Sequence, residues 1–272
     1  MSGKRPNDAD ARVATTGGPP LDRMFVLTMQ IGVFVFLMGS WELLSDLNVL
    51  DPFYFSRPSD VFWKMLVWIY TGFILPHLAV TLLEALLAFV IGTILGVGAG
   101  LALARIELLA RVFDPYIRIL NALPRVILGP IFILWFGLGM ASKVALAVTL
   151  VFFIVFFNTF QGIREVDPVV RNNARMLQAS EHQLLRYVYL PSAMAWIFSS
   201  LHTSIGFALV GAVVGEYLGS AEGIGYVVAQ AQGVFDTTGV FAGLILTSAV
   251  VLAIDFGINR LERYLLRWRP SN

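Results

Sequence analysis

Four ionisable residues lie within strongly apolar stretches of this sequence, namely Glu84, Arg125, Glu216 and Asp255. Charged side chains are costly in membrane hydrocarbon, so such residues usually face protein or water and mark ion pairs or solute pathways. Glu84 could be the structural partner of a basic residue, whereas Glu216 is expected at a wet membrane boundary. For Asp255 we expect a pair with Asn259 or Arg260 at the membrane interface.

Residues suited to covalent or metal chemistry are scarce. Cys is absent, which excludes thiolate catalysis, disulfides and cysteine-based metal sites. His77, His182 and His202 are scattered along the chain, so no metal or catalytic set is expected. The sequence also lacks a Gly-x-x-x-x-Gly-Lys-Ser/Thr loop that would bind nucleotide phosphates. We therefore expect no enzymatic activity and no cofactor in this chain, and a membrane-embedded enzyme is the weaker functional class.

The elements that must position these residues are membrane helices. Hydrophobic residues make up 57% of the 272 positions, charged residues make up 14%, and the mean hydropathy is +0.76. Long unbroken apolar runs exclude a membrane β-barrel. Runs of about the length that spans a bilayer cover residues 24–44, 78–104, 116–136, 144–160, 197–218 and 240–258. The fold class is therefore an all-α polytopic membrane protein with about six transmembrane helices.

The basic residues predict how this membrane domain is oriented. Of the 19 Lys and Arg residues, 15 lie in segments that would share one side, only Arg57, Lys64 and Lys143 would lie on the other, and Arg125 lies within a span. Short cytoplasmic segments retain Lys and Arg. Both termini and residues 164–191 are thus expected in the cytoplasm, and residues 52–70 and 220–237 outside. Residues 1–23 and 265–272 would be cytoplasmic tails, the first of them disordered, flanking a permease domain at 24–264.

The connection at residues 164–191 has a helical pattern. Apolar residues recur there at intervals of three, four and seven, at Val170, Ala174, Leu177, Leu184 and Val188. This spacing predicts an amphipathic helix pair with one apolar stripe. The stripe could lie against the membrane domain, lipid or a partner protein.

Small residues and prolines mark two further features. Gly92, Gly96 and Gly100 recur at four-residue spacing, which lets helices approach closely, as do Gly211 and Gly215. Such faces serve either helix movement or ordinary packing within one subunit. In the third span, Pro124 and Pro130 each remove a helical hydrogen bond and are expected to kink it.

The loop sequence resembles that of a known family. From Asn172 to Ser180, and on to Pro191, it is similar to the EAA loop of binding-protein-dependent ABC importer permeases. The residues that fit are Ala174, Arg175, Leu177, Ala179, Ser180, Leu190 and Pro191. Asn172, Asn173 and Gln178 depart from the pattern, in which Glu, Ala and Gly stand at these three positions.

The resemblance extends along most of the chain, from about residue 56 to residue 269. The matching segments are Leu123-Pro124-Arg125, Gly129-Pro130, Leu134 to Gly139, Gly215 to Gly219 and Gly223 to Tyr226. Together they resemble the nitrate, sulfonate and taurine branch of these permeases. The fold this implies, six spans with both ends inside, agrees with the hydropathy and charge patterns.

The resemblance implies a division of labour between subunits. Two permease copies would form the pore in the bacterial inner membrane, and a separate extracytoplasmic binding protein would deliver the solute. Nucleic acid is not expected as a partner. Two ATPase subunits holding ATP and Mg would dock on the loop. Its coupling residues would be Ala174, Arg175, Leu177, Gln178, Ala179, Ser180, Glu181, Leu190 and Pro191. An ATP-independent secondary transporter is the alternative.

The candidate pathway residues are Pro124, Arg125, Glu84 and Glu216. A guanidinium facing lipid costs at least about 2.5 kcal/mol, so Arg125 should face the pore, a carboxylate such as Glu84, or the cytosolic interface. A pore-lining Arg125 would attract an anionic solute such as nitrate, a sulfonate, taurine or bicarbonate.

Overall fold

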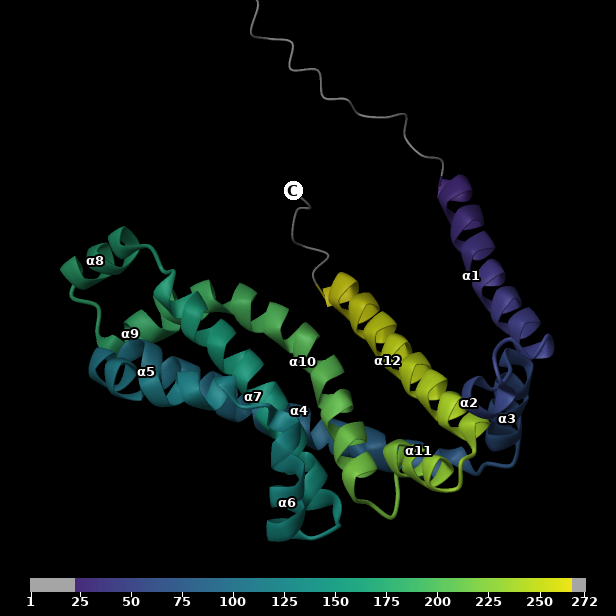
Figure 1. Cartoon of the computed structure of the whole chain (residues 1–272). Coiled ribbons are helices and arrows are strands. Elements are labelled where there is room, and N and C mark those ends of the chain that lie inside the picture. The colour runs from purple at the N-terminus through teal and green to yellow at the C-terminus, as the bar shows by residue number, and fades with distance from the viewer. Residues whose placement is uncertain (1–22, 266–272) are drawn as a thin grey trace, which may run out of the picture. The chain divides into compact units, whose positions relative to one another are not determined.

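The structure is a computed structural model and describes residues 23–265, all of whose regular elements are helical (Figure 1). It divides into two compact units, Met1–Pro58 and Ser59–Asn272. The expected tails at 1–23 and 265–272 lie almost entirely outside the described residues.

The first unit consists of α1 (Arg23–Asp46) and the short α2 (Pro52–Phe55). The Asp51 carboxylate caps α2 by accepting a hydrogen bond from the Phe53 N–H at 2.9 Å, and Pro52 occupies the first helical position. Arg57 and Asp46 form an ion pair at 3.1 Å. The apolar side chains along the first half of α1 are exposed, as expected of a helix whose neighbours are lipid or another protein.

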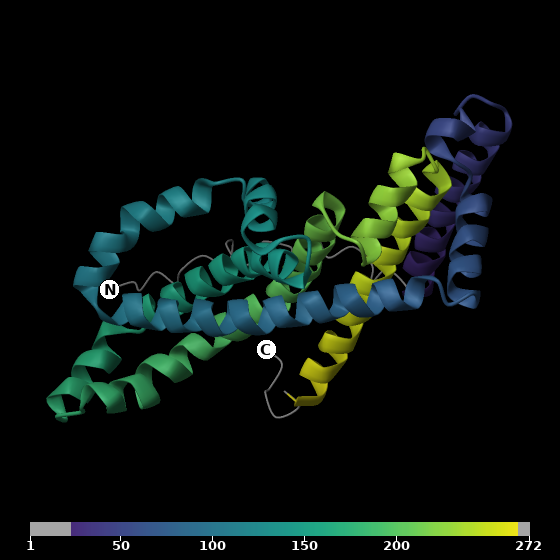
Figure 2. The ribbon, with the colours of Figure 1, turned by 90° about the horizontal axis from the view of Figure 1, so that it is seen from below.

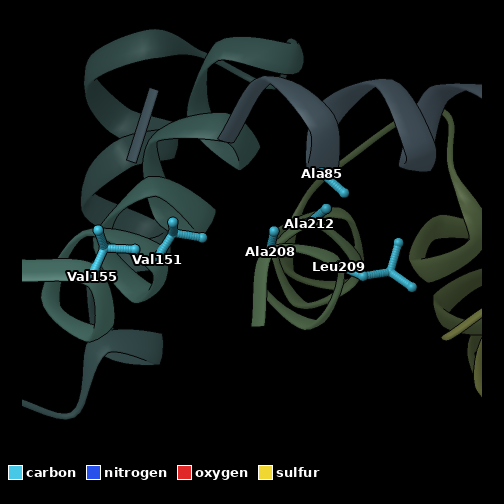
Figure 3. Packing of buried hydrophobic residues seen from close by; sticks show 6 residues of the cluster. All are labelled: Ala85, Val151, Val155, Ala208, Leu209 and Ala212. Carbon is cyan, nitrogen blue, oxygen red and sulfur yellow. The ribbon is translucent and has the colours of Figure 1, made fainter. Parts of the chain in front are cut away.

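Three long helices form the core of the second unit: α4 (Ile74–Arg105), α7 (Met140–Arg164) and α10 (Leu190–Leu218). Both α4 and α10 pack along α7 (Figure 1 and Figure 2). All three contribute to one buried cluster (Figure 3), made of Ala85, Val151, Val155, Ala208, Leu209 and Ala212. Three further helices of this unit are α3 (Pro58–Tyr70), α11 (Ile224–Gly233) and α12 (Thr237–Leu265).

Glycines allow these three helices to touch. A Cβ added at Gly92 would lie 2.7 Å from Val151 of α7, and one at Gly100 would lie 2.8 Å from Thr159. On α10, a Cβ at Gly211 would lie 2.6 Å from the Ala147 Cα. All three distances are shorter than side chains tolerate. The small-residue faces read from the sequence therefore pack against α7 within one subunit.

The third expected span is not a single helix. Residues 116–136 are divided between α5 (Glu107–Ala122), a 3-10 turn (Arg125–Ile127) and α6 (Leu128–Phe136), and the two arms bend by 81°. Pro124 disfavours helical geometry at Leu123, which is extended with ψ of 132°. The proline thus breaks the span rather than kinking it. Within residues 23–265, five apolar helices are long enough to cross a membrane, and the number of spans is six if this bent pair is counted as one.

The connecting segments gather at the two ends of α4. At its C-terminal end, Arg105 lies 3.8 Å from Glu181 of the 164–191 loop. At the other end, the His77 Nδ1 accepts a hydrogen bond from the Gly223 N–H at 3.1 Å. The 164–191 loop and the 220–237 segment, which are expected on opposite sides of the membrane, thus lie at opposite ends of α4.

Candidate functional site

The 164–191 loop forms the expected helix pair. The first helix, α8 (Pro168–Met176), begins at Asp167, whose carboxylate accepts from the Val169 N–H at 2.7 Å. The second, α9 (Glu181–Leu184), begins with a capping box, because Ser180 and Gln183 exchange side-chain and backbone hydrogen bonds. A π-helical turn (Leu185–Tyr189) then leads into α10, so Leu190 and Pro191 lie at the start of that helix.

Gln178 ends the first helix in an unusual backbone conformation. Its φ is +59°, in the left-handed region that favours glycine. The Ala179 N–H donates to the Ala174 carbonyl at 3.1 Å, and the Gln178 N–H donates to the Arg175 carbonyl at 2.9 Å. This is the Schellman arrangement, whose left-handed residue is usually Gly. Gln178, one of the three positions that depart from the EAA pattern, therefore has a backbone conformation that favours glycine, the residue of that pattern.

The apolar positions of the loop do not form one stripe. Leu184 is 1% exposed, and Ala174 and Val188 pack against the same cluster, which contains Ile163 and Tyr189. Leu177, in contrast, is 84% exposed, as is the neighbouring Met176 at 82%. The expectation of a single stripe is wrong, because the left-handed turn at Gln178 separates the two sets. The result is a loop anchored by Leu184 that presents an apolar tip, which we define as Met176 and Leu177.

Arg125 lies at the break between α5 and α6. Its guanidinium donates to the Asn121 side-chain oxygen at 2.5 Å and stacks over the Phe153 ring of α7 at 4.6 Å. Its partners are thus an amide and an aromatic face. The structure does not bring Arg125 and Glu84 together as an ion pair.

Glu84 and Glu216 lie together in the interior, each 1% exposed. The Glu216 carboxylate accepts from the Thr81 hydroxyl at 2.6 Å and from the Gly225 N–H at 2.7 Å. One Glu84 oxygen, Oε2, is buried without a hydrogen-bond donor among the described residues. The expectation that Glu216 is wet is therefore wrong, since the turn into α11 covers it.

Lys143 supplies the basic group near this carboxyl pair. It is 1% exposed and donates to the Leu138 and Gly139 carbonyls, with the latter at 3.0 Å. From the sequence, Lys143 was assigned only to the outer side of the membrane, and the structure places it in the first turn of α7. Glu84 was expected to be the structural partner of a basic residue. Lys143 is that basic residue, because its charge is buried near the carboxyl groups of Glu84 and Glu216. The sequence offered no signal for the contributions of Thr81 and Lys143.

Two polar contacts tie α12 to its neighbours. Asp255 lies 3.2 Å from His202 of α10, a partner that the sequence did not predict. Asp236, just before α12, accepts from Lys64 of α3 at 2.5 Å and from the Gly239 N–H at 2.9 Å. Burial acts to raise the pKa of Asp236, but these two donors outweigh it and lower the pKa below its ordinary value.

Known proteins resemble this chain over most of its length. Residues 92–267 match the family described as binding-protein-dependent transport system inner membrane component. The chain is 34% identical over 235 residues to the putative aliphatic sulfonates transport permease protein SsuC of Bacillus subtilis, covering 86% of this chain and 85% of that one. It is 27% identical over 254 residues to the taurine transport system permease protein TauC of Escherichia coli, covering 92% of each.

Solved structures share the fold at lower identity. A chain of the MetNI methionine ABC transporter in an inward facing conformation gives a TM-score of 0.62 at 17% identity, covering 72% of this chain and 97% of that one. A chain of an amino acid ABC transporter crystallised with histidines gives a TM-score of 0.60 at 22% identity. The match covers 74% of this chain and 96% of that one.

Proposed function

Because the chain belongs to the family of binding-protein-dependent transport system inner membrane components, of the sulfonate and taurine type, we propose that it forms the import path of a small anionic solute. The chain is the multi-pass permease subunit of an ABC importer in the inner membrane, and its partners include an ATPase and a binding protein. The names of related permeases include sulfonates, taurine, formylaminopyrimidine and riboflavin. Of these, the sulfonate and taurine names support an anionic solute such as a sulfonate, nitrate or bicarbonate.

The observation that carries the ATP-driven mechanism is the apolar tip of the loop. Two large apolar side chains, Met176 and Leu177, are more than four-fifths exposed on a turn whose backbone is fixed by helix caps on both sides. Exposed apolar groups on a rigid support are typical of a protein interface. We propose that the tip inserts into an ATPase subunit, while Leu184 transmits the movement to α10. An ATP-independent secondary transporter would not need this tip and is not favoured.

The pathway proposal rests on Arg125. Its contacts are Asn121 and the Phe153 ring, neither of which neutralises its charge. A cation held in place without a carboxylate partner among the described residues can attract an anion that passes the break between α5 and α6. Pro124 shapes the break, whereas buried Glu84 and Glu216 would reach a path only after a conformational change.

We further propose an assembly of two copies of this chain with two ATPases, which hold ATP and Mg and hydrolyse ATP. Large exposed apolar side chains on α6, Leu134 at 82% and Trp135 at 67%, are suited to contact lipid or the second copy. Both termini and the coupling loop would be cytoplasmic, in keeping with the distribution of Lys and Arg.

The charge substitution Leu177→Asp tests the coupling loop. It should release the ATPase and abolish solute-stimulated ATP hydrolysis in proteoliposomes without preventing membrane insertion, because a carboxylate would be desolvated at the interface. Val169→Asp is the matched control, since Val169 is an exposed apolar residue of α8 away from the tip. Retention of the ATPase and of stimulated hydrolysis by Leu177→Asp would refute the docking proposal.

A further inference from the structure

A cavity of about 430 Å³ lies where the coupling loop meets the ends of the long helices. Its lining includes Arg105 and Arg164, the last residues of α4 and α7, and Arg171 and Arg175 of α8. We call this cavity the arginine pocket. Ala110, near the start of α5, also belongs to the lining. The volume of the pocket falls within the range of small-ligand sites, about 300–1,000 Å³.

The charges that line the pocket are not balanced. Glu181 is the acidic residue in the lining and lies 3.8 Å from Arg105 and 3.7 Å from Arg175. Four guanidinium groups against one carboxylate leave an excess of three positive charges. Like charges held around one cavity repel each other, so an anion in the pocket would relieve that repulsion.

Arg171 has hydrogen-bonding capacity that the described residues do not use. It forms no ion pair with any described residue, and its Nε is buried without a hydrogen-bond acceptor. A buried polar atom of this kind normally has a partner. Arg164 stacks on Phe160 at 5.2 Å and likewise has no carboxylate partner among the described residues. Two guanidinium groups are thus available to an additional acceptor.

We propose that the arginine pocket binds a phosphate group at the membrane surface. Guanidinium groups bind phosphate through paired hydrogen bonds, and a cluster of them suits a group with several acceptor oxygens. Arg105 and Arg164 end two of the apolar helices that are long enough to cross a membrane, so we expect the pocket near the level of the phospholipid headgroups. Ala104, Ala110 and Ile163 add an apolar side to the pocket. The phosphate can come from an anionic lipid headgroup or from free phosphate.

The position of the pocket favours this ligand over an acidic segment of a partner protein. The apolar tip, which we assign to the ATPase, is exposed to solvent. The pocket lies instead between the loop and the helix ends, and Tyr189 in its lining is only 8% exposed. A bound phosphate would therefore connect α8 to α4 and α7 and fix the loop against the membrane domain.

Lipid binding to the full chain in a neutral detergent tests the proposal. Native mass spectrometry should show tighter binding of phosphatidylglycerol than of phosphatidylcholine to the wild-type chain. Arg171→Gln should lower the phosphatidylglycerol affinity on the order of fivefold, the factor expected for one basic residue near an anionic headgroup. Arg171→Lys should retain most of it. Arg186→Gln is the matched control, because Arg186 is exposed in the same loop and lies outside the pocket lining.

Competition by salt distinguishes the two sources of phosphate. If sodium phosphate displaces phosphatidylglycerol no better than sodium chloride at equal ionic strength, the headgroup is the ligand. If phosphate displaces it better, and does so less in Arg171→Gln, the pocket also accepts free phosphate. Equal binding of the two lipids together with no phosphate-specific effect would overturn the proposal, as would equal losses in Arg171→Gln and Arg186→Gln. Loss of ATPase co-purification in Arg171→Gln without any change in lipid or phosphate binding would instead assign the pocket to a carboxylate of the partner.

Discussion

Replacing Gln178 by glycine should stabilise the coupling loop. Gln178 holds φ of +59°, a conformation that costs an L-residue about 1–2 kcal/mol and costs glycine almost nothing. Glycine also loses more backbone entropy on folding, about 0.4–1 kcal/mol. The net gain is then roughly 0.5–1 kcal/mol, which should slow local opening about two- to fivefold.

Hydrogen exchange of the Ala179 amide measures this opening, because that N–H closes the turn by donating to Ala174. The assay would follow peptides that cover residues 174–184 in the full chain. Gln178→Ala is the control, since alanine removes the side chain but keeps the strain. The Ala179 amide should be protected most in Gln178→Gly and next in Gln178→Asn. The wild-type chain and Gln178→Ala should follow together, and Gln178→Val should be lowest, because β-branched residues tolerate left-handed backbone least.

Two results would refute this reasoning. If Gln178→Ala protects Ala179 as well as Gln178→Gly does, the gain comes from losing the side chain and not from the backbone. If Gln178→Gly speeds exchange, the entropy of glycine outweighs the relieved strain. Either outcome would mean that backbone strain at Gln178 does not limit the stability of this turn.

Four further predictions concern the membrane domain. Gly96→Leu should destabilise the chain by about 1–3 kcal/mol in thermal unfolding, because a Cβ there would lie 2.9 Å from Val155, whereas Gly98→Leu should be tolerated because nothing lies within 4 Å of that position. Glu84→Gln should lower the melting temperature less than Glu84→Ala, since an amide can donate to the Glu216 carboxylate and alanine leaves a cavity; equal losses would contradict this. The pKa of Asp236 is lowered, so its link to Lys64 contributes stability at neutral pH that is lost as the pH falls below the ordinary value of 3.8. Asp236→Asn should remove this part of the pH dependence of unfolding. An unchanged pH profile in that variant would rule the link out. In a chain without Cys, Ser180→Cys should react with a membrane-impermeant reagent only from the cytoplasmic face and Ser220→Cys only from the outer face, and the reverse pattern would invert the proposed orientation.

Several elements could be predicted from the sequence because their cause is local. The start of α8 follows from Asp167-Pro168, and the start of α9 follows from Ser180 and Gln183. The spacing of Gly92, Gly96 and Gly100 correctly indicates a face for close packing, although only the structure identifies α7 as the neighbour.

Other features depend on tertiary contacts that no local pattern contains. Pro124 could be assigned to a kink, but the 81° bend also depends on how α6 packs against α7. The burial of Glu216 is set by a turn that folds back over it and donates from Gly225. Likewise, periodicity alone placed Leu177 and Leu184 on one stripe of the predicted helix pair, because an interval of seven residues brings two side chains to one face only where the helical geometry is continuous between them. The left-handed turn at Gln178 ends that helix and sends the two leucines to different surroundings.

The glycine contacts along α7 restrict how this subunit can move. At Gly92, Gly100 and Gly211 the backbones are so close that sliding one helix along another would drive side chains into main-chain atoms. α4, α7 and α10 should consequently move as one rigid body. Hinges are then available where the chain leaves this body, and the break at Leu123 and Pro124 is the clearest of them. A cross-link that joins α5 to α6 across this break should arrest the transport cycle, whereas one that joins α4 to α7 should leave it running.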